Sequence, residues 1–163
     1  MEIRNASGRE LPQIMRLYEY ARRFMLEHGN PNQWGPTRWP PEPLVRADIE
    51  AGRCYVCLWE GRIAGVFTFL QGTDIEPTYR EIEEGAWLSD SPYGVVHRLA
   101  GGAAHGVGSA CLTWAFQKCG HLRVDTHPDN DVVQRLLQKN GFSYRGIIHV
   151  QQDAYPRLAY EKI

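Results

Sequence analysis

A glycine-rich stretch in the middle of the chain constrains the fold most. From Gly94 to Phe116 the sequence reads GVVHRLAGGAAHGVGSACLTWAF: an apolar run, a cluster of glycines, then an apolar pattern with helical spacing. This succession predicts a strand, a tight turn and a helix that starts near Gly106–Ser109. The face of that helix that packs on a sheet consists of Val107, Ala110, Cys111, Trp114 and Ala115.

The start of this predicted helix has the properties of an anion-binding site. The first N–H groups of a helix have no partner inside it, and they add to the positive end of the helix dipole, equivalent to about half a charge. Glycines let a ligand approach the backbone, so a pyrophosphate would fit here; a tight turn without a ligand is the alternative. A P-loop is excluded because Ser109 follows Gly108 where Lys is needed, and a dinucleotide fold wants a third glycine where the chain has Cys111.

The remaining patterns predict an α/β (α+β) domain. Strands are expected over 2–6, 54–59, 62–72, 93–100, 122–127, 143–150 and 157–163, and helices over 10–30, 43–53, 107–120 and 130–142. The tryptophan-containing segment 31–43 is too rich in proline for regular structure, and the acidic connection 73–90 is expected to be partly helical. The strand–helix–strand unit in the middle makes its two strands parallel. The simplest assembly is a single mixed, mostly antiparallel sheet of about seven strands with helices on both faces.

Composition narrows the class of protein. The 163 residues suffice for one domain, 1–163, and 43% hydrophobic with 23% charged residues is ordinary for a soluble globule. A formal net charge of -1 without a Lys/Arg-rich block argues against a nucleic-acid partner. The polar start MEIRNASGRE predicts no signal peptide, and no apolar run approaches the roughly 20 residues of a membrane helix, so a cytoplasmic protein is expected. The oligomeric state stays open, with a homodimer as one candidate.

The spacing Cys54-x-x-Cys57 suggests a metal or redox site, but CYVCLW also reads as a strand. Residues three apart on a strand point to opposite faces, so these two thiols could not share a metal. We therefore expect buried cysteines that act as small hydrophobes, and no metal.

A second helix start follows the neighbouring strand. Asn130 is placed to cap that helix, and Gly141-Phe142 fits a glycine C-cap with an apolar residue behind it. Two strand ends and two helix N-termini are thus expected at one edge of the sheet.

These residues resemble the GNAT superfamily of acetyl-CoA-dependent N-acetyltransferases. Members carry Arg/Gln-x-x-Gly-x-Gly/Ala between a strand and a helix, where this chain has Ala103-Ala104-His105-Gly106-Val107-Gly108, and HPDNDVVQRLLQKNGF is similar to the next conserved segment of the family. The resemblance implies a GNAT-like sheet with a splayed parallel strand pair. It also implies that acetyl-CoA is the co-substrate, with its pyrophosphate on the backbone amides of residues 104–109 and its pantetheine arm along the strand end. The residues that it places at the coenzyme are Leu99, Ala100, Gly101, Ala104, His105, Gly106, Val107, Gly108, Ser109, Asn130 and Lys139.

Two positions depart from the family pattern. Ala103 stands where members carry Arg or Gln, so one side-chain contact is lost; backbone N–H groups do most of the work in such anion sites, so binding should survive. Leu137 stands where many members have the tyrosine that protonates the departing thiolate. Thiol pKa values near ~8.5 allow the coenzyme to leave as a thiolate, and water or another side chain could supply the proton.

The expected reaction is direct attack of a primary amine of a small molecule or peptide on the acetyl thioester. An ammonium group with a pKa near ~10.4 must first lose a proton, so a base or a desolvating pocket is needed. Candidates are His97 and His127, near the two strand ends, and Glu81 and Glu84 in the acidic connection; each could instead be structural or simply solvated. A strand-end N–H such as that of Leu99 would stabilise the oxyanion.

The acceptor site is expected in the variable segments. Its candidate residues are Trp34, Trp39, Tyr79 and Trp87, although aromatic residues more often simply pack in the core. Acidic residues of the connection would favour a cationic acceptor; these are Asp74, Glu76, Glu81, Glu83 and Glu84. Two alternatives to an enzyme stay open: a non-catalytic acyl-CoA-binding module, which Leu137 makes plausible, and an interaction domain that has lost the coenzyme.

Overall fold

The computed structural model describes residues 1–163 and contains one seven-stranded mixed sheet with the strand order β1-β2-β3-β4-β5-β7-β6. The strands are β1 (Glu2–Asn5), β2 (Cys54–Trp59), β3 (Arg62–Gly72), β4 (Tyr93–Gly101), β5 (Leu122–Thr126), β6 (Ser143–His149) and β7 (Pro156–Lys162). The helices are α1 (Leu11–Glu27), α2 (Glu42–Glu50), α3 (Val107–Cys119) and α4 (Asp131–Lys139). The predicted α/β fold is therefore confirmed, including the parallel pairing of β4 with β5 among otherwise antiparallel neighbours.

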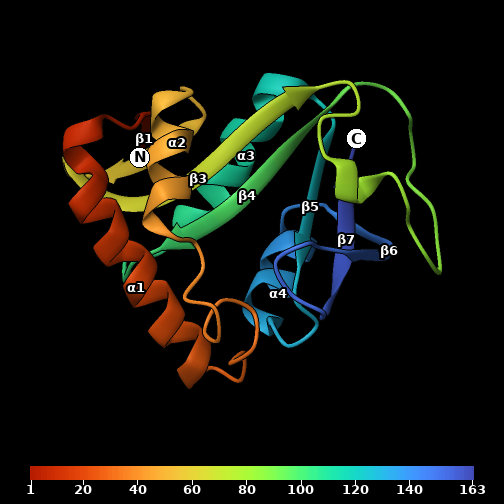
Figure 1. Ribbon diagram of the computed structural model, residues 1–163. Coiled ribbons are helices and arrows are strands. Elements are labelled where there is room, and N and C mark those ends of the chain that lie inside the picture. The colour runs from red at the N-terminus through yellow and green to blue at the C-terminus, as the bar shows by residue number, and fades with distance from the viewer.

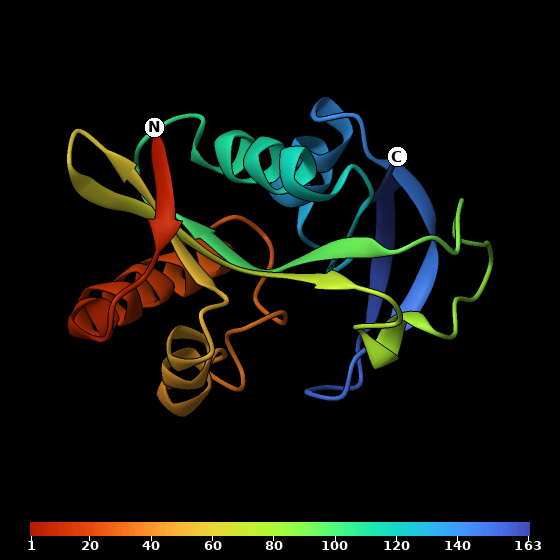
Figure 2. The same cartoon turned by 90° about the horizontal axis from the view of Figure 1, so that it is seen from above.

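Helices cover both faces of the sheet, with α1 and α2 on one side and α3 and α4 on the other (Figure 1; Figure 2). One apolar cluster joins α1 and α2 to Val56 and Val66, and a second joins α3 to Phe67 and Phe69. Neighbouring residues of β3 thus point alternately into the two clusters, as the two-residue period of a strand requires. Burial of apolar surface on both faces is what holds this sheet together.

The prediction for the cysteines agrees with the structure. Cys54 packs in the cluster below α1 and α2, whereas Cys57 packs in the cluster below α3. The two thiols therefore lie on opposite faces of β2, both of them buried. They fill space in two separate cores and do not face one another.

The acidic connection 73–90 differs from its prediction. Only the 3-10 turn Pro77–Tyr79 is helical, and the rest of the segment has no regular structure apart from a bridge between Glu83 and Ile147. Side chains hold this segment in place instead, since the Trp87 indole donates to the Tyr79 carbonyl at 2.8 Å. Tyr79 itself is buried below it. None of the helices is long and apolar enough to cross a membrane.

Candidate active site

A cavity of about 360 Å³ lies where β4 and β5 separate. The two strands pair only at Gly94–Leu122 and Val95–Arg123, and beyond these pairs they diverge (Figure 2). The cavity is lined on one side by the loop between α1 and α2, at its base by β4 and β5, and on the other side by α4. It therefore reaches through the sheet and joins its two faces.

An irregularity in β4 shapes this opening. The register with β3 shifts between Val66 and Thr68, which leaves an extra residue in β4 near Arg98. Arg98 adopts a φ of 52°, a left-handed conformation that non-glycine residues rarely take. Such bulges bend a strand and re-aim its side chains. Here both His97 and Arg98 line the cavity.

The turn into α3 presents unpaired backbone donors. Gly106 has a φ of 80° and no side chain caps the helix. The first hydrogen bond of α3 runs from the Ala110 N–H to the Gly106 carbonyl at 3.0 Å, so the N–H groups of residues 107–109 donate to no backbone carbonyl. A left-handed residue followed by helical residues aims successive N–H groups into one concave nest that suits an anion. Only glycine adopts this φ without strain, which explains Gly106.

Other residues of this turn have packing roles. A Cβ atom on Gly108 would lie 2.6 Å from Leu136 Cδ2, so this glycine lets α4 approach α3. The Ser109 hydroxyl accepts a hydrogen bond from the side chain of Asn140, the residue that follows α4, at 3.0 Å. Lys139 is exposed in the last turn of α4. The glycines thus serve two purposes, one at the nest and one between helices.

Asn130 caps α4 as predicted, and it also reaches the opposite wall of the cavity. Its Oδ1 accepts from the Val133 N–H at 3.0 Å, while its Nδ2 donates to Gln33 Oε1 at 2.8 Å. Gln33 Oε1 accepts a second hydrogen bond from Asn30. The side chain of Asn130 is therefore occupied within the protein, where it ties α4 to the loop between α1 and α2.

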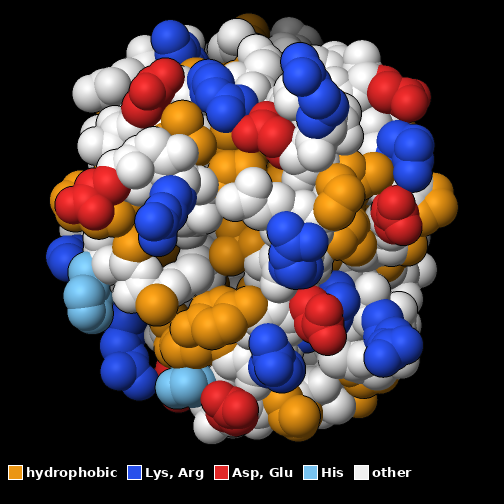
Figure 3. Space-filling model, turned by 90° about the vertical axis from the view of Figure 1, so that its left-hand side faces the viewer, with side chains coloured by type: hydrophobic (Ala, Val, Ile, Leu, Met, Phe, Trp, Pro, Cys, Tyr) orange, Lys and Arg blue, Asp and Glu red, His pale blue; other side chains and the backbone are white.

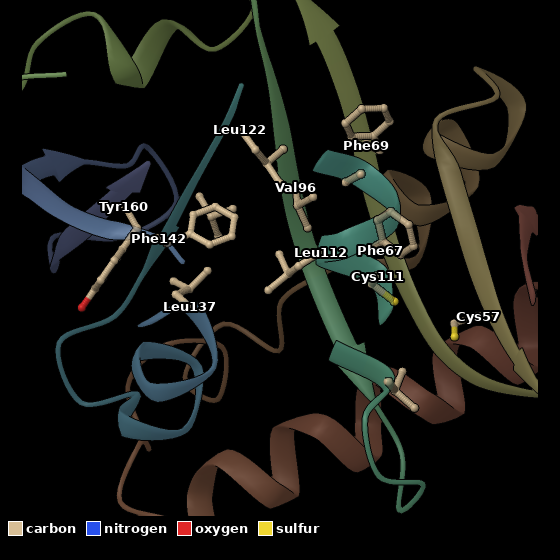
Figure 4. Close-up of a cluster of buried hydrophobic side chains, with 13 residues drawn as sticks. Cys57, Phe67, Phe69, Val96, Cys111, Leu112, Leu122, Leu137, Phe142 and Tyr160 are labelled. Carbon is tan, nitrogen blue, oxygen red and sulfur yellow. The ribbon is translucent and has the colours of Figure 1, made fainter. Parts of the chain in front are cut away.

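Leu137 is fully buried in the apolar cluster below α3 and also lines the cavity. Figure 4 shows its side chain next to Phe142 and directed toward Leu112. No tyrosine is among the residues that line the cavity. The cavity therefore contains no phenol group that could replace the tyrosine that many members of the family have at the position of Leu137.

His97 belongs to a chain of hydrogen bonds at the base of the cavity. Its Nε2 lies 2.6 Å from Glu76 Oε2, and its Nδ1 lies 4.0 Å from Asp125 Oδ2. Asp125 in turn accepts a hydrogen bond of 2.6 Å from the Tyr79 hydroxyl. The Thr78 amide and hydroxyl both donate to the other oxygen of Glu76. His97, Glu76 and Asp125 all line the cavity.

Burial alone raises the pKa of Glu76, but the hydrogen bonds from His97 and Thr78 and the charge of His97 outweigh it and lower this pKa to about 2. Glu76 is therefore a carboxylate that accepts, and the Nε2 of His97 is the donor. A neutral imidazole that donates through Nε2 keeps a lone pair on Nδ1. His97 thus holds Nε2 on Glu76, while its Nδ1, 4.0 Å from Asp125 Oδ2, makes no hydrogen bond within the protein.

The other three candidate bases lie away from the cavity. Glu81 and Glu84 are exposed and do not line it. His127 is buried, and its Nδ1 accepts from the Asp129 N–H at 3.0 Å. Burial and the nearby Arg157 lower the pKa of His127. Of the four predicted candidates, the structure brings His97 alone to the cavity.

The four aromatic candidates for the acceptor site divide into two pairs. Trp34 and Trp39 line the cavity from the loop between α1 and α2. Tyr79 and Trp87 do not line it, and their rings pack on each other at a tilt of 47°, with 5.3 Å between ring centroids. This second pair contacts the cavity indirectly, because the Tyr79 hydroxyl donates a hydrogen bond to Asp125.

Among the cavity residues that the sequence analysis missed are Gln33, Arg53, Arg98 and Asp125. Each carries a polar group that the fold brings in from a different segment, and no local motif marks any of them. Of the acidic residues of the connection, Glu76 alone lines the cavity. Glu76 is held at the cavity by its hydrogen bond to His97, which lies 21 positions further along the chain.

The fold with its splayed parallel strands and the nest at α3 defines an α/β protein of the acetyltransferase class, and comparison with known proteins supports this class. The family model described as Acetyltransferase (GNAT) family matches residues 14–142. A GNAT-family acetyltransferase from Streptococcus agalactiae 2603 is 32% identical, with a TM-score of 0.90 over 99% of this chain and 94% of that one. The chain therefore belongs to the GNAT acetyltransferase family.

More distant structures share the fold. A GNAT-family acetyltransferase from Listeria monocytogenes is 18% identical, with a TM-score of 0.71 over 99% of this chain and 93% of that one. AAC(6')-Ib, solved in complex with ribostamycin and coenzyme A, is 17% identical, with a TM-score of 0.64 over 98% and 91% of the two chains. No curated protein sequence matches the chain.

Proposed function

We propose that this protein transfers an acetyl group from acetyl-CoA to a primary amine of a small molecule or peptide by direct attack. The observation that carries the proposal is the nest of unpaired N–H groups at residues 107–109, next to the cavity in which His97 and Glu76 meet. Acetyl-CoA supplies the reactive thioester, and AAC(6')-Ib provides an example of this fold that holds coenzyme A. A helix N-terminus with a positive dipole end is suited to the pyrophosphate.

In this proposal the coenzyme occupies the α4 side of the cavity. The pyrophosphate rests on the turn from Ala104 to Ser109, and the free edge of β4 from Leu99 to Gly101 pairs with the pantetheine arm. Leu137 forms part of the apolar wall on this side. Asn130 contributes by fixing the position of α4, because its side-chain oxygen and nitrogen both already form hydrogen bonds within the protein.

His97 accepts the proton of the acceptor amine at Nδ1. The Glu76 carboxylate, 2.6 Å from Nε2, then stabilises the imidazolium that forms. The amine nitrogen attacks the acetyl carbonyl carbon while the bond to sulfur breaks, and the Leu99 N–H stabilises the charge that develops on oxygen. The nitrogen then loses its second proton to solvent and becomes the amide. Because no tyrosine lines the cavity, the coenzyme leaves as a thiolate, which a thiol pKa near ~8.5 permits.

The placement of the coenzyme is tested at Ala103, which is exposed at the beginning of the turn. Ala103→Glu puts a negative charge beside the pyrophosphate, and we expect the Kd for acetyl-CoA to rise about fivefold to tenfold, equivalent to about 1 kcal/mol. Ala103→Gln is the uncharged control of the same size; because members of the family carry Gln at this position, it should leave the Kd unchanged or lower it. S-acetylpantetheine, which lacks the pyrophosphate, should bind wild type and Ala103→Glu equally. An equal loss for both ligands would contradict this placement.

Turnover separates the enzyme from the two alternatives. Acetyl-CoA consumption is followed across a panel of amines for wild type and His97→Gln. An N-acetyltransferase acetylates at least one amine, and we expect His97→Gln to lower kcat at least about a hundredfold at pH 7. Tight acetyl-CoA binding without turnover of any amine would indicate a non-catalytic module, and no binding at all would indicate an interaction domain.

A further inference from the structure

A buried carboxylate on the acceptor side of the sheet holds two arginines that both line the cavity. Asp48 on α2 is buried; its Oδ1 accepts from Arg53 Nε at 2.7 Å. Its Oδ2 accepts from Arg98 Nε and Nη2 at 3.0 and 2.8 Å, and from the Thr68 hydroxyl at 3.0 Å. These hydrogen bonds fix both guanidinium groups at the rim of the cavity.

The charges of this cluster do not balance. Two guanidinium groups share one carboxylate, so the cluster of Arg53, Arg98 and Asp48 carries one excess positive charge. The Arg98 side chain is 15% exposed and the Arg53 side chain 37%, so solvent compensates this charge only in part. Removing a charge from water without a partner is costly, and an anionic group of a ligand would supply the partner.

Donors remain free to receive such a group. Asp48 engages only Nε of Arg53, which leaves both of its terminal nitrogens, and one terminal nitrogen of Arg98 is also unused. Guanidinium donors in a planar fork match the two oxygens of a carboxylate. The third arginine of the cavity, Arg157, is already held by both oxygens of Asp153 at 3.1 and 2.7 Å.

Acidic side chains lie next to this cluster of positive charge. Glu76 and Asp125 flank His97, which neighbours Arg98 in β4. His97 is paired with Thr68, whose hydroxyl bonds to Asp48, so the two groups of charges share one face of the sheet. The cavity is therefore dipolar, with carboxylates where an amine would react and free guanidinium donors beside it. Outside the cavity, the face of α1 carries basic side chains that alternate with acidic ones and form no single patch (Figure 3).

We propose that the acceptor is an amine that also carries a carboxylate, of the size of an amino acid. The carboxylate binds Arg53 and Arg98, while the amine faces His97 between Glu76 and Asp125. A cavity of about 360 Å³, shared with the end of the coenzyme, favours such a small molecule. This inference rests on the proposed acetyl transfer, and it narrows the predicted cationic acceptor to a zwitterionic one.

The test compares common L-amino acids with their α-carboxamides, which keep the amine and lose the negative charge. Binding is measured in the presence of coenzyme A from the fluorescence of Trp34 and Trp39, and acetylation is measured as kcat/KM. We expect the best acid to exceed its amide by about tenfold or more in both measurements. Arg53→Gln should reduce this ratio to about twofold, and Arg53→Lys should restore part of it. Arg46→Gln, an exposed arginine of α2 outside the cavity, is the control and should leave the ratio unchanged.

The outcomes separate this inference from the proposed function. Amides that bind as well as the acids, no binding of any acid, or an acid preference that Arg53→Gln leaves intact would overturn the zwitterionic acceptor. If acids bind selectively through Arg53 but no acetyl group is transferred, the carboxylate-binding role of Arg53 and Arg98 stands and the acetyltransferase proposal fails.

Discussion

The carboxylate of Glu76 makes a contribution to stability that depends on pH. Its pKa is about 2 in the folded protein, against a usual value of 4.5, because the hydrogen bonds and charge of its partners outweigh its burial. A group whose pKa is lowered by folding stabilises the fold above its unfolded pKa. That contribution is lost as the pH falls from 4.5 toward 2. The difference between the two values corresponds to about 3 kcal/mol.

Glu76→Gln removes this contribution and keeps the size of the side chain. At pH 6 we expect the variant to be about 2–3 kcal/mol less stable than wild type, slightly below the full value because 17% of the Glu76 side chain is exposed. At pH 3 the difference should shrink to about 1 kcal/mol, since wild type has then lost most of the same contribution. Urea denaturation, followed by tryptophan fluorescence at each pH, measures both values.

Glu83→Gln is the matched control. Glu83 also pairs with a histidine, His149, at 3.3 Å, but the two side chains are 64% and 57% exposed. Exposed pairs contribute little, so this variant should change stability by less than about 1 kcal/mol at either pH. A destabilisation by Glu76→Gln that is the same at pH 6 and pH 3 would refute the reasoning, because it would mean that the carboxylate gains nothing from being charged.

Two further predictions concern the core and the buried cluster of charges. Asp48→Asn leaves Arg53 and Arg98 without their carboxylate and should lower the free energy of unfolding by about 3 kcal/mol. The control Asp131→Asn, at an exposed position, should lower it by less than about 1 kcal/mol. Equal effects of the two substitutions in urea denaturation would contradict the role of Asp48. Leu137→Ala empties a fully buried position and should cost about 2–5 kcal/mol in the same assay, so a neutral substitution would place this side chain outside the core.

The regular elements of the fold were predictable because each has its own local pattern. The apolar period of α1, the glycine after α3 and the hairpin of β2 and β3 are each a signal contained in one continuous stretch of sequence. The connection 73–90 was not predictable in this way. Its acidic residues suit a solvated helix, but Tyr79 is drawn into the core and Trp87 closes over it, so burial of these rings determines the conformation. Tertiary packing often overrides local propensity in such segments.

The coenzyme side and the acceptor side of the candidate site also differ in how far the sequence predicts them. The nest at Gly106 is made of backbone, and backbone geometry follows from glycine spacing and a helix start, both of which are visible in the sequence. The acceptor side is made of single side chains from α2, the turn before β2, β4, β5 and the connection. Arg98 reaches Asp48 50 positions away, and His97 reaches Glu76 21 positions away. Only the folded sheet brings such pairs together, so the sequence predicted the coenzyme side and missed Arg53 and Arg98.

The bulge in β4 links the two sides physically. The pairing of β4 with β5 ends at Val95, and the extra residue near Arg98 bends β4 where the cavity and the free strand edge lie. The same irregularity places Arg98 in a left-handed conformation, where Asp48 holds its guanidinium group and the Tyr18 hydroxyl donates to its carbonyl at 2.8 Å. A conformation that costs about 1 kcal/mol or more persists only where the surroundings fix it. Contacts from α1 and α2 do so here, and the same residue that opens the coenzyme side thereby carries a charge of the acceptor side.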